Sequence, residues 1–152
     1  MRALTLIRQP GRRQRLVLEA FRELCHAWYL VRFKEFRSYA RDLGDPHPGA
    51  FETTELHEDT EFLRDVRWSI EAINRTGGGR YTCLMQGMAG KAMLNKRDVP
   101  NTLILGAKLK REDGAPKDDG MAAHAWLRTG PVILLGGDAM AGYVPVTSYH
   151  NS

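Results

Sequence analysis

Hydrophobic residues recur every three or four positions through the first third of the chain. From Arg12 to about Leu43 no glycine or proline interrupts the sequence. Its most regular apolar positions are Val17, Phe21, Leu24, Trp28 and Val31. Their spacing is close to the period of a helix and predicts one long amphipathic helix with this stripe turned toward the core. The segment GDPHPG at residues 44–49 ends that helix, because proline removes a backbone donor and glycine is a poor helix former.

Two shorter helices are predicted by the same periodicity. The first runs from about Thr60 to Asn74 and is followed by Gly77-Gly78-Gly79. Its apolar positions are Phe62, Leu63, Val66, Ile70 and Ile73. The second runs from about Thr82 to Asn95, where the basic pair Lys96-Arg97 and then Pro100 end it. Basic side chains suit the negative end of a helix, and proline cannot continue one.

The pattern changes to short apolar or β-branched runs after about residue 100. Four strands are predicted: Thr102–Leu109, Ala122–Arg128, Val132–Leu135 and Tyr143–Tyr149. Helices first and strands afterwards are typical of an α+β fold, with N-terminal helices packed on one face of an antiparallel β-sheet. We expect one domain over residues 1–152, helical over about 12–95 and forming the sheet over about 100–150. The polar segment 111–120 should be a mobile loop that could gate a cleft, since it directly precedes the second strand.

Charge is unevenly distributed along the chain. The net charge is +4, yet residues 1–41 hold ten Arg or Lys against three Glu, a local +7. Such an end can attract an acidic protein or nucleic acid. Basic and aromatic residues do not alternate as they do in nucleic-acid-binding proteins. The basic residues are therefore interpreted as a solvent-exposed helix face, and no nucleic-acid partner is expected.

The chain carries no sequence signal for export or membrane insertion. No apolar run approaches the roughly 20 residues of a membrane span, and the first residues do not resemble a signal peptide. The two cysteines are far apart and form no disulfide framework. The sequence therefore predicts a cytoplasmic protein with free thiols and no membrane partner.

One of the two cysteines lies at a predicted helix start. Cys83 follows TGGGRYT and opens the third helix. The positive end of the helix dipole favours a thiolate there, and the free backbone N–H groups can bind an oxyanion. Gly87 and Gly90 share the face of Cys83, which predicts that another element approaches this face closely. A second oxyanion donor could come from Arg80 or Gln86, and the sequence does not choose between them.

The strand AAHAWLR is the predicted neighbour of this helix. Its His124 is flanked by alanines, which leave room around an imidazole able to take the thiol proton and return one to a leaving amine. An acid beside it would orient the ring, and Asp138 follows the next strand. With a two-residue hairpin loop, in which Arg128 lies opposite Pro131, the Asp138 side chain is on the face of the sheet opposite to His124. A three-residue loop, or a bulge at Gly136-Gly137, places it on the face of His124, and Pro131 favours the longer loop.

The other cysteine and the other histidines point to no further site. Cys25, within LCHAWYL, is predicted to be a buried and inert small residue among apolar neighbours. His57-Glu58-Asp59 lacks the second histidine of an HExxH site, and no CxxC pair occurs. We therefore expect neither a metal nor a cofactor.

The sequence resembles the lasso-peptide leader peptidases, which are transglutaminase-like cysteine proteases. The resemblance covers nearly the whole chain. Its most specific segments are TCL at 82–84 and HAW at 124–126, within TGGGRYTCLMQGMAGKAML and HAWLRTGPVILLGGD. It implies a papain/transglutaminase-like core and a triad of Cys83, His124 and Asp138. Glycines at 87 and 90, where the family more often has alanine-like residues, and the Gly-Gly before Asp138 depart from the family pattern.

The resemblance also implies a reaction and its partners. Members of this family hydrolyse the bond between the leader and the core of a precursor peptide, and a separate ATP-dependent, asparagine-synthetase-like cyclase then closes the macrolactam. The first helix begins at about residue 12 and leaves no room for a fused recognition domain, so a separate leader-recognition protein is expected. The alternative, from the residues alone, is a non-catalytic adaptor that binds an acidic protein or nucleic acid through its basic N-terminal helix.

Overall fold

The computed structural model describes residues 10–51, 53, 55, 57–109 and 121–151. The helices in this part are α2 (Pro10–Phe33), α3 (Phe36–Tyr39), α4 (Thr60–Thr76) and α5 (Cys83–Asn95), with short 3₁₀ turns η1 (Ala40–Leu43) and η2 (Gly137–Ala139). The strands are β1 (Asp45–Pro48), β2 (Asn101–Leu109), β3 (Met121–Thr129), β4 (Val132–Leu135) and β5 (Val144–Asn151). They form one sheet in the order β1-β5-β2-β3-β4, and every neighbouring pair is antiparallel.

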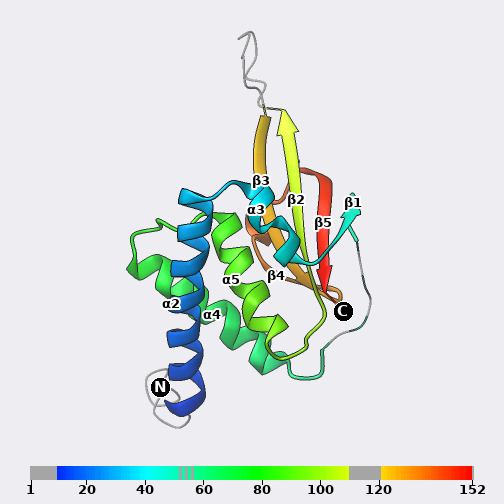
Figure 1. Cartoon of the computed structure of the whole chain (residues 1–152). Coiled ribbons are helices and arrows are strands. Elements are labelled where there is room, and N and C mark those ends of the chain that lie inside the picture. Colours follow the sequence, from blue (N-terminus) through cyan, green and yellow to red (C-terminus); the bar gives the residue numbers. More distant parts are fainter. Residues whose placement is uncertain (1–9, 52, 54, 56, 110–120, 152) are drawn as a thin grey trace.

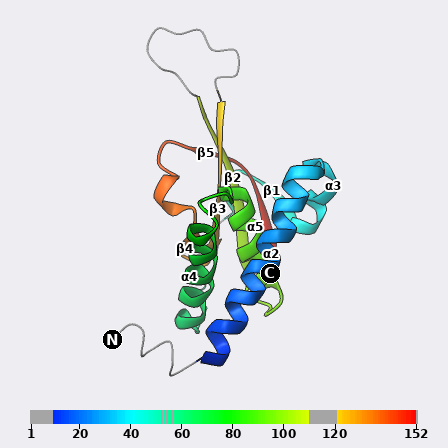
Figure 2. The same cartoon turned by 90° about the vertical axis from the view of Figure 1, so that its left-hand side faces the viewer.

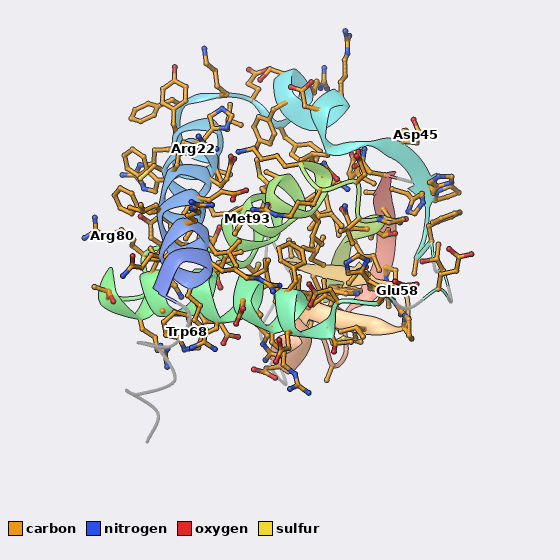
Figure 3. The ribbon with its side chains drawn as sticks, turned by 90° about the horizontal axis from the view of Figure 1, so that it is seen from below. Arg22, Asp45, Glu58, Trp68, Arg80 and Met93 are labelled. Atoms are coloured by element: carbon orange, nitrogen blue, oxygen red, sulfur yellow. The ribbon has the colours of Figure 1, made fainter. Side chains whose placement is uncertain are left out.

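The helices form a layer against one face of the sheet. Figure 1 shows α2, α4 and α5 on one side, with β5 and β1 at the other. α5 contacts β2, β3 and β4, while α2 packs across α5 and α4. Met93 of α5, labelled in Figure 3, is fully buried in this core. The predicted α+β arrangement is confirmed.

α4 follows its predicted hydrophobic face. The Asp59 carboxylate accepts a hydrogen bond of 2.9 Å from the backbone N–H of Phe62, which satisfies one of the free donors at the helix start. Phe62, Leu63, Val66 and Ile70 are buried, as the spacing predicted. The helix continues two residues beyond the predicted end, to Thr76.

α2 turns a different face to the core from the one predicted. Its buried side chains are Leu16, Ala20, Leu24 and Ala27. Phe21 is 54% exposed and Trp28 is 37% exposed, so the predicted stripe is wrong at these two rings, while Leu24 is buried and Val31 packs against the core. The helix has apolar residues on two faces, and the face with two alanines allows a closer approach to α5 than one with large rings. The guanidinium of Arg13 fixes the rotation, since it lies 3.1 Å from the Asp65 carboxylate and over the Trp68 ring of α4.

The segment from residue 34 to residue 48 also differs from prediction. α2 ends at Phe33, ten residues earlier than expected, and Glu35 is extended with φ −73° and ψ 143°. The residues Asp45–Pro48, expected only to end a helix, form β1 and pair with β5 at the edge of the sheet. Proline lacks an N–H donor and is tolerated in a strand only at such an edge. Gly44 makes the turn possible, because a Cβ there would lie 2.6 Å from His150 O.

The pairing of β3 with β4 has a register that the sequence did not predict. Thr129 pairs with Val132, so the loop consists of Gly130 and Pro131, with Gly130 at φ +55°. The register then shifts between Leu127 and Arg128, which inserts one extra residue in β4. The predicted three-residue loop and the predicted bulge at Gly136-Gly137 are both wrong. The bulge lies inside the strand instead.

The two glycines of α5 allow the close approach that was predicted for them. A Cβ at Gly87 would lie 2.7 Å from the side chain of Leu103. One at Gly90 would lie 2.7 Å from Leu135 and 2.8 Å from Leu127. Such distances are shorter than van der Waals contact, so a larger residue at either position would require these leucine side chains to shift.

Candidate active site

Cys83 is the first residue of α5, as predicted. Thr82 is the N-cap, with φ −70° and ψ 166°, and its hydroxyl accepts a hydrogen bond of 3.3 Å from the N–H of Met85. The thiol is free and half-buried against the core. The first backbone N–H groups of a helix have no partner within the helix, so this thiol lies beside donors that can bind an anion.

The turn before Cys83 is held by its own polar side chains. The Tyr81 N–H donates to Asn74 Oδ1 at 3.1 Å, and Gln86 Nε2 donates to Tyr81 O at 2.9 Å. Arg80 Nε donates to Gly77 O at 3.0 Å. The two side chains considered as oxyanion donors thus brace the turn that presents the thiol.

His124 is buried in β3 between two aromatic rings. Its ring centroid lies 5.9 Å from that of Trp126 and 5.1 Å from that of Tyr143. Its Nε2 lies 2.7 Å from Gly136 O. A carbonyl oxygen can only accept, so Nε2 must carry a proton, and in the neutral ring Nδ1 is then the basic nitrogen. The imidazole therefore has a fixed tautomer.

Cys83 and His124 lie toward opposite faces of the sheet. α5 packs on the face that carries Leu103 and Leu127. Successive residues of a strand point to opposite faces, so His124 points away from α5. The Gly136 carbonyl that His124 contacts directly precedes η2, which belongs to the orange segment in Figure 2. β3 is the neighbour of α5, as expected, but through Leu127 rather than through His124.

Asp138 lies in η2 and is exposed. In the described part of the chain it forms no hydrogen bond or ion pair with His124. The segment it belongs to does reach His124, through the carbonyl of Gly136 two residues earlier. Gly136 has φ +81°, and a Cβ there would lie 2.5 Å from Ala125 O. The Gly-Gly pair is the sequence signal for this close crossing of β3.

Lys91 was not anticipated. It lies in α5 and is 1% exposed, and its Nζ donates to Asn101 Oδ1 at 2.7 Å and to Tyr149 O at 3.1 Å. Burial lowers the pKa of this amine from 10.5 to about 7. A lysine within the apolar run MAGKAML is the signal that could have found it. It ties α5 to β2 and β5, far along the helix from Cys83.

Cys25 is exposed on α2, so the prediction that it is buried is wrong. Its apolar sequence neighbours Leu24 and Ala27 are buried, but a helix turns each successive residue by about 100° and leaves Cys25 outside. The apolar residues next to Cys25 in the sequence were therefore no guide to its burial.

Part of the basic charge of α2 is neutralised within the fold. The guanidinium of Arg12 lies 3.1 Å from the Asp59 carboxylate, and that of Arg13 lies 3.1 Å from Asp65. These two arginines hold α2 to α4, so the cations of α2 that remain for an acidic partner lie elsewhere on the helix. Within the described ranges no three His, Cys, Asp or Glu side chains are grouped as metal ligands, and no helix could cross a membrane. The predicted gating loop at 111–120 lies outside the described residues.

Comparison with known proteins gives one match. The model of the transglutaminase-like superfamily matches residues 27–148, which include Cys83, His124 and Asp138. No curated protein and no solved structure matches the chain. The chain belongs to the transglutaminase-like superfamily.

Proposed function

We propose that this protein is a cysteine peptidase that removes the leader from a lasso-peptide precursor. The observation that carries the proposal is the half-buried thiol of Cys83 at the Thr82-capped start of α5, within a transglutaminase-like domain. This arrangement places a nucleophile beside unpaired backbone donors, which acyl transfer requires.

In this mechanism the sulfur of Cys83 attacks the carbonyl carbon of the scissile bond, and its proton passes to Nδ1 of His124. The N–H groups at the start of α5 stabilise the oxyanion. The C–N bond then breaks, and the imidazolium gives its proton to the leaving amine. Water attacks the thioester, and the thiol is regenerated.

The imidazole has to change its position for this reaction. His124 points away from α5 in the structure, so the proposal requires the start of β3 to turn its side chain toward Cys83 when a peptide binds. Before that movement, the hydrogen bond from Nε2 to Gly136 O holds the tautomer in which Nδ1 is the basic nitrogen. Asp138, two residues from Gly136, is the acid proposed to stabilise the imidazolium.

The substrate and the partners follow from the resemblance at TCL and HAW. The substrate is a precursor made of leader and core, and the product is the core with a free amino terminus. A separate recognition protein would present the leader, and a separate ATP-dependent cyclase would close the ring. The reaction itself needs no cofactor.

A double-mutant cycle tests whether Cys83 and His124 act as one unit. Cleavage of a candidate precursor is followed by mass spectrometry for Cys83→Ala, His124→Ala and the double variant, with and without the recognition protein. Residues that act in one step are strongly non-additive, so the double variant should be no slower than the Cys83→Ala variant. His26→Ala, an exposed histidine on α2, is the matched control and should cleave normally. Full activity of His124→Ala would remove His124 from the mechanism.

A further inference from the structure

A groove runs between α2 and the C-terminal half of α5. Its first part is a hollow of about 610 Å³ lined by Arg15, Leu18, Glu19, Arg22, Lys96 and Arg97. Its second part is a hollow of about 430 Å³, which shares Lys96 and is lined mainly by apolar atoms, including those of Ala27, Leu30, Met88 and Ala92. We call these two hollows together the α2 groove. From Arg15 to Leu30 the helix rises by about 22 Å, the length of a helix of about 15 residues.

The first hollow carries more positive than negative charge. Arg97 forms a paired contact with Glu19 at 2.7 Å, and Lys96 lies 3.0 Å from Glu23. The hydrogen bond from Arg97 lowers the pKa of Glu19, so this pair is fully ionised near neutral pH. Arg22 shares Glu23 at 3.4 Å, and Arg15 has no ion-pair partner among the described residues. Across the α2 groove these four cations thus face three carboxylates, those of Glu19, Glu23 and, in the second hollow, Asp42.

Leu18 is an exposed apolar side chain at the edge of the first hollow, and further exposed apolar side chains lie along α2. Leu18 is 69% exposed, and Phe33, at the far end of α2, is 63% exposed. The Phe33 ring lies 5.7 Å from both the Trp28 ring and the Tyr29 ring. Large exposed apolar side chains gathered along one helix mark an interaction surface more often than a solvated one. Figure 3 shows Arg22 on α2, away from the strands.

The charge of the groove identifies its occupant. A second copy would bring the same cationic surface against itself, which is unfavourable. A flat lipid surface would meet the exposed apolar side chains of α2 but not the cations that line the hollow from the end of α5. An amphipathic helix with carboxylates on one side fits both hollows, with its acids beside Arg15 and Arg22 and its apolar side chains beside Leu30 and Met88.

We propose that the α2 groove binds an acidic amphipathic helix of another protein. Such helix-in-groove recognition uses apolar anchors at helical spacing, and charge complementarity selects the partner. Cys83 and His124 lie outside the groove, so binding and cleavage are separable. A peptide that binds normally to Cys83→Ala protein would leave this proposal intact even if no precursor is cleaved.

The test measures binding of a fluorescent acidic amphipathic peptide of about 18 residues, with Leu and Phe on one helical face and Glu on the other. A peptide of the same composition in scrambled order is the control ligand. Wild-type protein should bind the first peptide at least about tenfold more tightly than the second. Arg15→Glu with Arg22→Glu should weaken binding about tenfold, and it should abolish most of the salt dependence of binding.

Matched variants of the same chain distinguish the groove from a general surface effect. Arg64→Glu with Arg75→Glu makes the same charge change on α4, where both arginines are exposed, and binding should stay within about twofold. Leu18→Ser should weaken binding several-fold, whereas Val144→Ser, at a position 66% exposed on β5, should not. Thermal melts confirm that each variant is folded.

Four results would overturn the proposal. They are equal binding of the scrambled peptide, equal loss in the α4 variants, absence of peptide binding, and a dimer in sedimentation that Leu18→Ser dissociates. Vesicles containing phosphatidylserine are measured in parallel. Binding to vesicles but not to the peptide, lost on Arg15→Glu with Arg22→Glu, would assign the surface to a membrane and contradict the proposal.

Discussion

The start of α5 and the middle of α2 each hold one cysteine, in opposite kinds of surroundings. Cys83 is half-buried and lies at a capped helix terminus, where backbone N–H groups are unpaired. Cys25 is exposed but lies inside α2, where each backbone N–H bonds the carbonyl four residues earlier. The two cysteines therefore allow a test of whether nearby backbone donors, rather than exposure, make a thiol a nucleophile.

The largest expected effect is on the rate of precursor cleavage, which should differ between variants of the two cysteines. Cys83→Ala should reduce precursor cleavage by at least about 10³-fold, because no other group can form the thioester. Cys25→Ala should change the rate by much less, since its exposed side chain reaches the Tyr81 side chain but cannot replace the sulfur of Cys83. Initial rates from mass spectrometry measure both. A loss of activity in the Cys25 variant alone would reverse the assignment.

The second effect concerns the two faces of α2. Leu24→Ala should lower the free energy of unfolding by about 2–5 kcal/mol, because it removes a fully buried side chain from the contact with α5. Phe21→Ala should change it by less than about 0.5 kcal/mol, since that ring is mostly exposed. Urea unfolding of both variants gives the values. Equal losses would mean that α2 packs through the stripe that the sequence suggested.

The third effect is a pH dependence of stability above pH 7 that Lys91 of α5 produces. Burial lowers the pKa of Lys91 to about 7, whereas the unfolded chain has the ordinary value of 10.5. Unfolding therefore takes up a proton between these two values, so stability should rise as pH increases from 7 toward 10. The slope approaches about 1.4 kcal/mol per pH unit, and this group adds no dependence well below pH 7. Lys91→Met should remove the slope in urea melts at pH 7, 8 and 9. An unchanged slope would show that another group titrates.

The fourth effect compares glycines in the two helices. Gly90→Ala should destabilise the fold by about 1–3 kcal/mol, because the added methyl would meet Leu135 and Leu127 below 3 Å. Gly11→Ala in α2 meets nothing within 4 Å and should change stability by less than about 1 kcal/mol. Thermal unfolding of both variants is the measurement. A smaller loss for Gly90→Ala than for Gly11→Ala would contradict the close packing of α5 on the sheet.

The elements that the sequence predicted well are those in which one signal dominates. α4 has a single apolar face and an acidic N-cap, and α5 begins at Cys83 after three glycines and the Thr82 N-cap. Its glycines predicted close packing because their cost in a helix requires a reason. The order of helices before strands was sufficient for the fold class.

The remaining errors occur where two solutions have similar local energies. α2 offers two apolar stripes, and only the tertiary contacts of Arg13 and the small alanines select one. The register of β4 depends on a bulge that no glycine marks. The face of His124 depends on which side the helices cover, and alternation along a strand does not say which side that is. The triad was therefore expected to be in contact, whereas the structure separates Cys83 from His124.

The most direct test of the central claim is to identify the residue that carries the acyl group. The protein is mixed with precursor, quenched in acid within seconds, and digested for peptide mapping by mass spectrometry. We predict a hydroxylamine-sensitive adduct with the mass of the leader on the peptide that contains Cys83, and none on the peptide that contains Cys25. Precursor cleavage without an adduct on Cys83, or an adduct on Cys25, would contradict the account.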